Sequence, residues 1–188
     1  KPVWQKDLGD KRMRNQFGEG STPFLHKNTL VIVWDQITGG SFIVALDKRD
    51  GRELWRVARE EIDTWATPLV IEVDGKAQAI VPAMRRVRSY DLETGAVVWE
   101  ADGLTINPIP SPVFDDGLVF LMRGFQGNDL KATRVAGAKG NLDGTPAVVW
   151  TFDRDTPYVP SPIVADGVLY FLKTNSGVLS AFDARTGM

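Results

Sequence analysis

Asp47-Lys-Arg-Asp-Gly51-Arg-Glu-Leu-Trp55 decides the fold of this 188-residue chain, because the pattern returns 44 residues later as Asp91-Leu-Glu-Thr-Gly95-Ala-Val-Val-Trp99. The shared pattern is Asp-x-x-x-Gly-x-x-x-Trp. Its first half appears again at Asp183-Ala-Arg-Thr-Gly187, and two further tryptophans, Trp4 and Trp150, lie at similar spacings. Self-similarity with a period in the mid-forties indicates one supersecondary unit that is repeated along the chain.

The order of sequence signals is the same in every unit. A small residue and a proline open each unit, at Ser21-Thr22-Pro23, Ala66-Thr67-Pro68, Pro110-Ser111-Pro112 and Pro160-Ser161-Pro162. A short apolar run follows, and then a turn pair, at Lys27-Asn28, Asp74-Gly75, Asp116-Gly117 and Asp166-Gly167. Asp-Gly between apolar runs favours a β-hairpin, because both turn residues need positive φ.

Three more strands complete the unit, and the last of them carries the tryptophan. No segment has helical apolar spacing over a useful length. Four short antiparallel strands in about 45 residues are typical of a propeller blade. The sequence therefore predicts an all-β fold, a β-propeller built of four-stranded antiparallel blades, with about four blades present.

The repeated aspartate, glycine and tryptophan positions have a structural interpretation. An aspartate can accept backbone N–H bonds across a turn, and glycine adopts the left-handed conformation that other residues avoid. A large ring at a fixed offset from that turn can pack between neighbouring sheets. We expect structural roles for Trp4, Asp47, Gly51, Trp55, Asp91, Gly95, Trp99, Trp150, Asp183 and Gly187.

The third unit departs from the pattern. Arg134 stands where the aspartate is expected, and the following turn is longer by about seven residues, through 136–144. Glycine-rich insertions of this kind are usually loops. We expect an exposed loop that the fold tolerates.

The Asp-x-x-Thr-Gly-x-x-x-Trp pattern resembles the tryptophan-docking motif of the PQQ-like (pyrroloquinoline quinone) β-propeller repeat. That repeat occurs in quinoprotein alcohol dehydrogenases and in non-catalytic outer-membrane assembly lipoproteins. The resemblance covers essentially the whole chain, as a single segment 1–188. Alignment of the repeats predicts blades at about 21–55, 66–99, 110–150 and 160–188, with the last completed by residues 1–4, which match the end of the repeated pattern.

Such repeats usually occur as eight blades, so the resemblance implies half of an eight-bladed propeller or a fragment of a longer protein. A homodimer that completes a propeller and a closed four-bladed ring are the alternatives. We favour the fragment, because the chain begins and stops within the repeated pattern. An isolated arc would expose two sheet faces.

Candidate binding residues gather on one predicted rim, which holds the links between blades and the loops between the second and third strands. Trp65, Asn107 and Tyr158 occupy similar positions just before the proline of successive blades, so they are expected to ring the channel mouth. Cationic donors nearby favour an anion or carboxylate ligand. The predicted ligand-binding residues are Trp65, Arg85, Arg86, Asn107, Arg123, Tyr158, Lys173 and Asn175.

Few residues suit catalysis. Cysteine is absent, and His26 at a turn is the one histidine. Metal-ligating motifs, nucleophile elbows and phosphate-binding glycine loops are missing from the sequence. With a net charge of −2, the chain has no basic field to bind nucleic acid, and no apolar run is long enough for a transmembrane helix. We assign no catalytic residue and no metal ligand.

The sequence therefore predicts a non-catalytic PQQ-like propeller domain that binds a protein, peptide or small ligand on its loop-rich rim, with no cofactor. The alternative is a fragment of a PQQ- and calcium-dependent alcohol or sugar dehydrogenase, an oxidoreductase. A purely architectural segment of a larger enzyme is a third reading. The resemblance implies a periplasmic or extracellular location.

Overall fold

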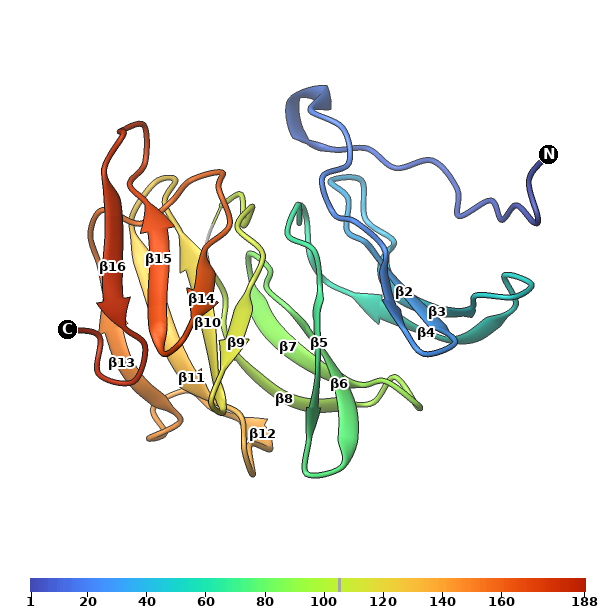
Figure 1. The fold of residues 1–188 in the computed structure, drawn as a ribbon. Helices are drawn as coiled ribbons and strands as arrows, with labels where there is room; N and C mark the ends of the chain where they lie inside the picture. Colours follow the sequence, from blue (N-terminus) through green and yellow to red (C-terminus); the bar gives the residue numbers. More distant parts are fainter. Residues whose placement is uncertain (105) are drawn as a thin grey trace.

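The computed structural model describes residues 1–104 and 106–188, which fold into four antiparallel sheets arranged side by side (Figure 1). One short 3-10 helix, η1 (Arg14–Gln16), precedes the first sheet. The all-β prediction and the partial propeller are therefore confirmed. The first sheet has the order β1 (Phe24–His26), β2 (Thr29–Trp34), β3 (Ser41–Asp47) and β4 (Glu53–Arg59).

The other three sheets repeat this meander. The second contains β5 (Leu69–Val73), β6 (Lys76–Val81), β7 (Arg86–Asp91) and β8 (Val97–Asp102), with β12 (Gly140–Asn141) added beside β8. The third contains β9 (Val113–Asp115), β10 (Leu118–Arg123), β11 (Asp129–Arg134) and β13 (Val148–Phe152). The fourth contains β14 (Ile163–Ala165), β15 (Val168–Leu172) and β16 (Leu179–Asp183).

The hairpin between the first two strands has the predicted turn. Asp74 and Gly75 have φ of 51° and 74°, and Asp166 and Gly167 have φ of 52° and 76°. Positive φ at both central residues matches the twist of the flanking strands, which is why Asp-Gly recurs at this place. Each turn fixes the register of its hairpin.

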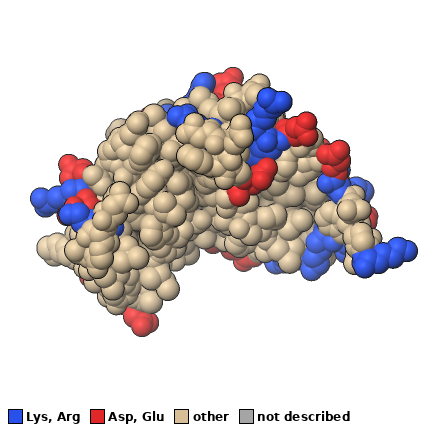
Figure 2. All heavy atoms as spheres, turned by 90° about the horizontal axis from the view of Figure 1, so that it is seen from above, with Lys and Arg blue, Asp and Glu red and all other residues tan. Residues whose placement is uncertain are grey.

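Apolar side chains fill the space between successive sheets. Val31, Val33 and Ile43 of the first sheet pack with Ala79 and Val81 of the second. Similar clusters join the second sheet to the third and the third to the fourth. The first strands approach one another, β1 against β5 and β9 against β14, and Figure 2 shows the resulting arc with a hollow on one side.

Three of the four repeat tryptophans lie on a glycine of the next blade. Nε1–H of Trp55 donates to the carbonyl of Leu92 at 2.9 Å, and a Cβ added to Gly95 would lie 2.7 Å from the ring. Trp4 meets Gly51 and Trp150 meets Gly187 with the same geometry. Only glycine permits both this approach and the positive φ of these turns.

Trp99 is held differently. Its Nε1–H has no hydrogen-bond partner among the described residues, and its side chain is fully buried. The insertion that follows Arg134 covers it: β12 pairs in parallel with β8, and Leu142, 5% exposed, packs in the same cluster. Gly140 and Asn141 are exposed, as expected for a loop, but the insertion also contains a short strand and the buried Leu142, which the loop prediction did not include. The segment serves the preceding blade as an additional strand.

The two ends of the arc differ. Residues 1–13 run across the outer face of the first sheet, where Trp4 and Leu8 pack against the cluster of Phe42, Val44 and Leu46. The last sheet has three strands, and its face carries the exposed side chains of Ile163 and Leu179. Residues 1–4 form no strand and Trp4 contacts the first blade, so the completion of the last blade by 1–4 stays a prediction. The predicted bounds of the four blades also remain predictions.

Candidate ligand pocket

A ladder of hydrogen bonds joins the four inter-blade links just before their prolines. The N–H of Thr22 donates to Oγ1 of Thr67, the N–H of Thr67 to Oγ of Ser111, and the N–H of Ser111 to Oγ of Ser161. The distances are 3.2, 2.9 and 3.0 Å. A hydroxyl side chain precedes proline in every unit, and those of Thr67, Ser111 and Ser161 each accept one bond of this ladder.

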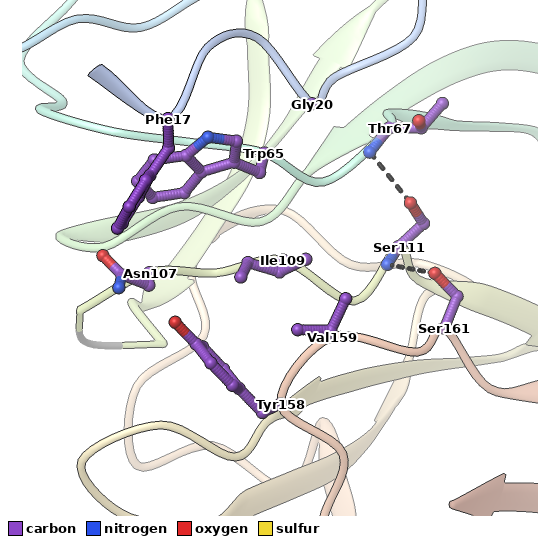
Figure 3. A pocket seen from close by; sticks show the side chains of 10 residues that line it. All are labelled: Phe17, Gly20, Trp65, Thr67, Asn107, Ile109, Ser111, Tyr158, Val159 and Ser161. Atoms are coloured by element: carbon purple, nitrogen blue, oxygen red, sulfur yellow. Dashed lines mark hydrogen bonds between the residues drawn. The ribbon is translucent and has the colours of Figure 1, made fainter. Parts of the chain in front are cut away.

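The ladder lies beside a pocket of about 450 Å³ formed by the same four links (Figure 3). Each link contributes side chains from a different blade. The lining consists of Phe17, Gly20, Trp65, Thr67, Asn107, Ile109, Ser111, Tyr158, Val159 and Ser161. Three of the eight predicted ligand residues, Trp65, Asn107 and Tyr158, are therefore brought together here, as their matching places in the repeat predict.

Trp65 forms a fixed wall of the pocket. Its backbone N–H donates to the carbonyl of Pro108, and its Nε1–H donates to the carbonyl of Gly18 at 3.0 Å. A Cβ on Gly20 would lie 2.8 Å from the indole, so this glycine permits the ring to pack on the backbone. The side chain is only 9% exposed. The ring therefore forms part of the pocket wall and offers little exposed surface on which a ligand could stack.

Two other aromatic side chains stand at the mouth. Phe17 is 65% exposed, next to the Trp65 ring in Figure 3. Tyr158 is half-buried and stacks on Phe125, with ring centroids 4.7 Å apart. The stack fixes the orientation of Tyr158. Phe17 is therefore the more accessible of the two apolar surfaces.

Asn107 is the unusual polar residue of the site. It is 6% exposed, yet its Oδ1 has no hydrogen-bond partner among the described residues. Its backbone has φ of 56°, a left-handed conformation that asparagine tolerates better than most residues. Figure 3 shows the side chain between the rings of Phe17 and Trp65 on one side and Tyr158 on the other. A buried acceptor without a partner costs about 1–3 kcal/mol.

The predicted cationic residues do not line this pocket. Arg86 binds Asp102 and Asp143 at 3.0 and 2.7 Å, and so holds the inserted segment against β8. Arg123 lies 3.7 Å from Asp129. Three further predicted ligand residues also lie outside the lining: Lys173, which pairs with Asp155 at 2.7 Å, and the exposed Arg85 and Asn175.

The buried carboxylates of this rim also have protein partners. Arg59 forms a bidentate pair with Asp35 at 2.8 and 3.0 Å, and both side chains are fully buried. Nη1 of Arg59 also bonds the hydroxyl of Tyr90 in the second blade. Burial lowers the pKa of Arg59, but the charge and hydrogen bond of Asp35, together with the charges of Tyr90 and Glu61, outweigh it and leave the pKa raised. The pair thus joins two blades as a permanent ion pair.

Glu61 caps a loop of the second blade. Its two carboxylate oxygens accept the backbone N–H groups of Arg85 and Arg86 at 2.9 and 3.1 Å. Burial raises the pKa of Glu61, and the Arg85 hydrogen bond and the charge of Arg59 only partly offset this effect. The remaining buried carboxylate, Asp63, binds Arg14 at 3.0 Å. These carboxylates stabilise the links between blades. Because their oxygens already bind protein groups, we do not assign them to ligand binding.

The residues present do not fit the calcium and quinone of a quinoprotein dehydrogenase. The pocket lining contains no carboxylate, whereas calcium requires six to eight oxygen ligands that usually include several carboxylates. Within 1–104 and 106–188, no group of three or more His, Asp or Glu side chains is placed to hold a metal. We therefore derive no chemical step through such a cofactor.

Sequence reasoning missed two features of the pocket. Ile109 and Val159 supply its aliphatic surface, but apolar residues next to proline give no signal of exposure. The missing partner of Asn107 depends on three-dimensional surroundings that spacing does not describe. Phe17 was not among the predicted ligand residues, although it lies in a link of the predicted rim. Its aromatic side chain was the signal that could have identified it.

Radial four-stranded blades joined through tryptophan–glycine contacts define a propeller-repeat protein of the PQQ-like class. The profile of the family described as outer membrane protein assembly factor BamB matches residues 1–144. The chain belongs to this family. A comparison with curated proteins finds no match.

Solved structures show the same fold. BamB from Moraxella catarrhalis is 23% identical with a TM-score of 0.61, and the match covers 99% of this chain and 51% of that one. A quinohemoprotein alcohol dehydrogenase from Comamonas testosteroni is 15% identical with a TM-score of 0.61, over 90% of this chain and 34% of that one. The chain thus spans about half the length of the BamB structure. Among the described residues, no helix has the length and hydropathy of a membrane span.

Proposed function

We propose that this chain is a non-catalytic propeller segment whose loop-rich rim binds a partner protein at the pocket between the inter-blade links. The observation that carries the proposal is the pocket itself. It presents exposed aromatic and aliphatic side chains and one buried amide without a partner. Concave sites with an apolar lining and few polar groups are the usual form of a binding site.

The family supports a protein partner. The matched description is that of an outer membrane protein assembly factor, and assembly is work done by binding other proteins. We extend a periplasmic or outer-membrane location to this chain as part of the proposal. A homodimer and a small-molecule ligand stay predictions from the sequence.

The second candidate is a segment of a quinoprotein dehydrogenase, favoured by the likeness to quinohemoprotein alcohol dehydrogenases. In that case other blades would have to provide the ligands. Titration of the full-length protein with PQQ and calcium would then give tight binding and a change in visible absorbance. Under our proposal the titration is flat.

Photo-crosslinking in cells tests the rim. p-Benzoylphenylalanine in place of Phe17 puts the reactive ketone at the mouth of the pocket, on a side chain that is 65% exposed. The matched control replaces Val97, which is 46% exposed at the start of β8 on the opposite rim. We expect one dominant protein adduct from position 17 in the full-length protein and none from position 97.

Two results would contradict the proposal. Equal adducts from both positions would indicate contacts made by chance. No adduct from position 17, with the protein folded and expressed at its normal level, would show that the rim has no stable protein partner.

A further inference from the structure

We infer that the pocket recognises a neutral, extended peptide segment, which places one aromatic or branched apolar side chain against Phe17 while its backbone amide bonds Asn107. The inference rests on the proposed function and names the chemistry of the partner at the same site. It differs from the sequence-based expectation of an acidic ligand, because the cations of the rim lie elsewhere.

The amide of Asn107 is the first argument. A carboxamide offers two N–H donors and a carbonyl acceptor, and here the carbonyl has no partner although the residue is 6% exposed. Buried polar groups without partners are rare enough in native proteins to need an explanation. A peptide bond carries the complementary N–H and C=O side by side, so one ligand amide satisfies both halves of the side chain.

The hydroxyl ladder is the second argument. Thr67, Ser111 and Ser161 accept backbone N–H groups through their oxygens, which leaves each O–H hydrogen to be donated elsewhere. All three residues line the pocket. They form a row of donors that suits successive carbonyl oxygens of an extended chain.

The apolar surface is the third argument. Phe17 and Val159 are 65% and 56% exposed, and both line the pocket together with Ile109, which is drawn between them in Figure 3. An apolar side chain of a ligand that covers these groups removes them from water, at about 25 cal/mol per Å². Trp65 and Tyr158 are held by their own contacts and give the pocket a fixed shape.

The charge of the pocket selects a neutral ligand. None of its ten lining residues is Asp, Glu, Lys, Arg or His. A charged ligand group placed here would lose hydration without gaining an ion pair. Oligosaccharides also use aromatic rings and amides, so a sugar is included as the competing outcome in the test.

The test uses the full-length protein with isotope-labelled methyl groups and three probes. The probes are the uncharged peptide acetyl-Gly-Leu-Phe-Gly-amide, its acidic analogue acetyl-Asp-Leu-Phe-Asp-amide, and chitotriose. We expect the neutral peptide to shift the Ile109 and Val159 methyl resonances at millimolar concentration. The acidic analogue should bind at least about tenfold more weakly, a difference of about 1.4 kcal/mol.

Two variants locate the contact. Asn107→Asp removes the donor and adds a charge, and should weaken the neutral peptide at least about tenfold. Its control is Asn175→Asp, an exposed asparagine with φ of 50°, close to the 56° of Asn107. Phe17→Ser lies on the surface and leaves folding intact, and should weaken the peptide roughly fivefold. If a melting experiment shows that Asn107→Asp is unfolded, the binding of the peptide to Phe17→Ser tests the inference instead.

The inference fails if the peptide causes no localised shifts, if Phe17→Ser and Asn107→Asp bind it as the unchanged chain does, or if chitotriose binds more tightly. A crosslink at position 17 combined with failure of the peptide would leave the proposed function standing and remove this ligand chemistry. Peptide binding without any crosslink would support this ligand chemistry and contradict the proposed protein partner.

Discussion

Trp55 and Trp99 occupy the same place in successive blades, yet the structure holds them in two different ways. Trp55 is half-buried, lies on Gly95 and donates its N–H to the carbonyl of Leu92. Trp99 is fully buried, with an N–H that has no partner in the described part of the chain. The difference follows from the next blade, which has an Asp-x-x-x-Gly turn after Trp55 but Arg134-x-x-x-Ala138 after Trp99.

The comparison shows that a blade can lose its tryptophan-supporting turn if other chain covers the ring. β12 and Leu142 do so here, and the second sheet gains a protected outer edge. An outer strand with unpaired backbone groups is otherwise a site of unwanted pairing. Trp99 lacks the indole hydrogen bond that Trp55 makes, but its ring is more deeply buried. The two tryptophans should therefore respond differently to substitution.

Truncation of the two rings should give the largest effect. Trp99→Ala removes a fully buried side chain and should lower the free energy of unfolding by about 3–5 kcal/mol. Trp55→Ala should cost about 2 kcal/mol, because that side chain is only partly buried. Chemical denaturation of both variants measures the difference. Equal losses would show that burial does not distinguish the two tryptophans.

Substitution of glycine separates backbone strain from the ring contact. Gly95→Ala places a methyl group 2.7 Å from Trp55 at φ of 77°, and should cost about 2–3 kcal/mol. Gly75→Ala has nearly the same φ, 74°, with nothing within 4 Å, and should cost about 1 kcal/mol. Thermal melts followed by tryptophan fluorescence compare them. If both variants lose the same stability, the contact with the ring contributes nothing.

The aspartate of the turn should give the smallest effect, visible mainly as pH dependence. Partial burial raises the pKa of Asp91, but hydrogen bonds from Thr94 and Glu93 outweigh it, so the pKa lies below its ordinary value. This stabilisation is present above the ordinary aspartate pKa of about 3.9 and is lost as pH falls through the lower folded value.

Asp91→Asn should therefore cost about 1 kcal/mol at pH 7 and flatten the acid part of the stability curve below about pH 4. Arg134→Ala, at the equivalent place in the third blade, should leave that part unchanged. Urea denaturation between pH 2.5 and 7 measures both. An acid limb as steep in Asp91→Asn as in the unchanged chain would assign the effect to other groups.

Much of the fold was predictable, because repetition makes each signal appear several times. The hairpin turns at Asp74-Gly75 and Asp166-Gly167 are found where the sequence places them. The β12 pairing was not predictable, since it joins Gly140 to Trp99 across a blade boundary. Sequence spacing shows that an insertion exists and gives no sign of the strand that it contacts.

The site was predictable only in part, for a related reason. Trp65, Asn107 and Tyr158 share a place in the repeat, so the symmetry of the fold gathers them in one pocket. Arg86 and Lys173 were expected beside them, but carboxylates at Asp143 and Asp155 bind these cations first. Choice among ion-pair partners depends on side-chain geometry, which a single sequence does not contain.

The ladder of hydrogen bonds from Thr22 to Ser161 gives the arc a direction, because its two ends offer different groups to a neighbour. Each rung takes its donor from the earlier blade and its acceptor from the later one, from Thr22 through Ser161. A neighbouring blade beside β14 extends the series only by offering a hydroxyl, and one beside β1 only by offering an N–H. Any further blade would therefore continue the ladder only head to tail, and an inverted copy would not continue it.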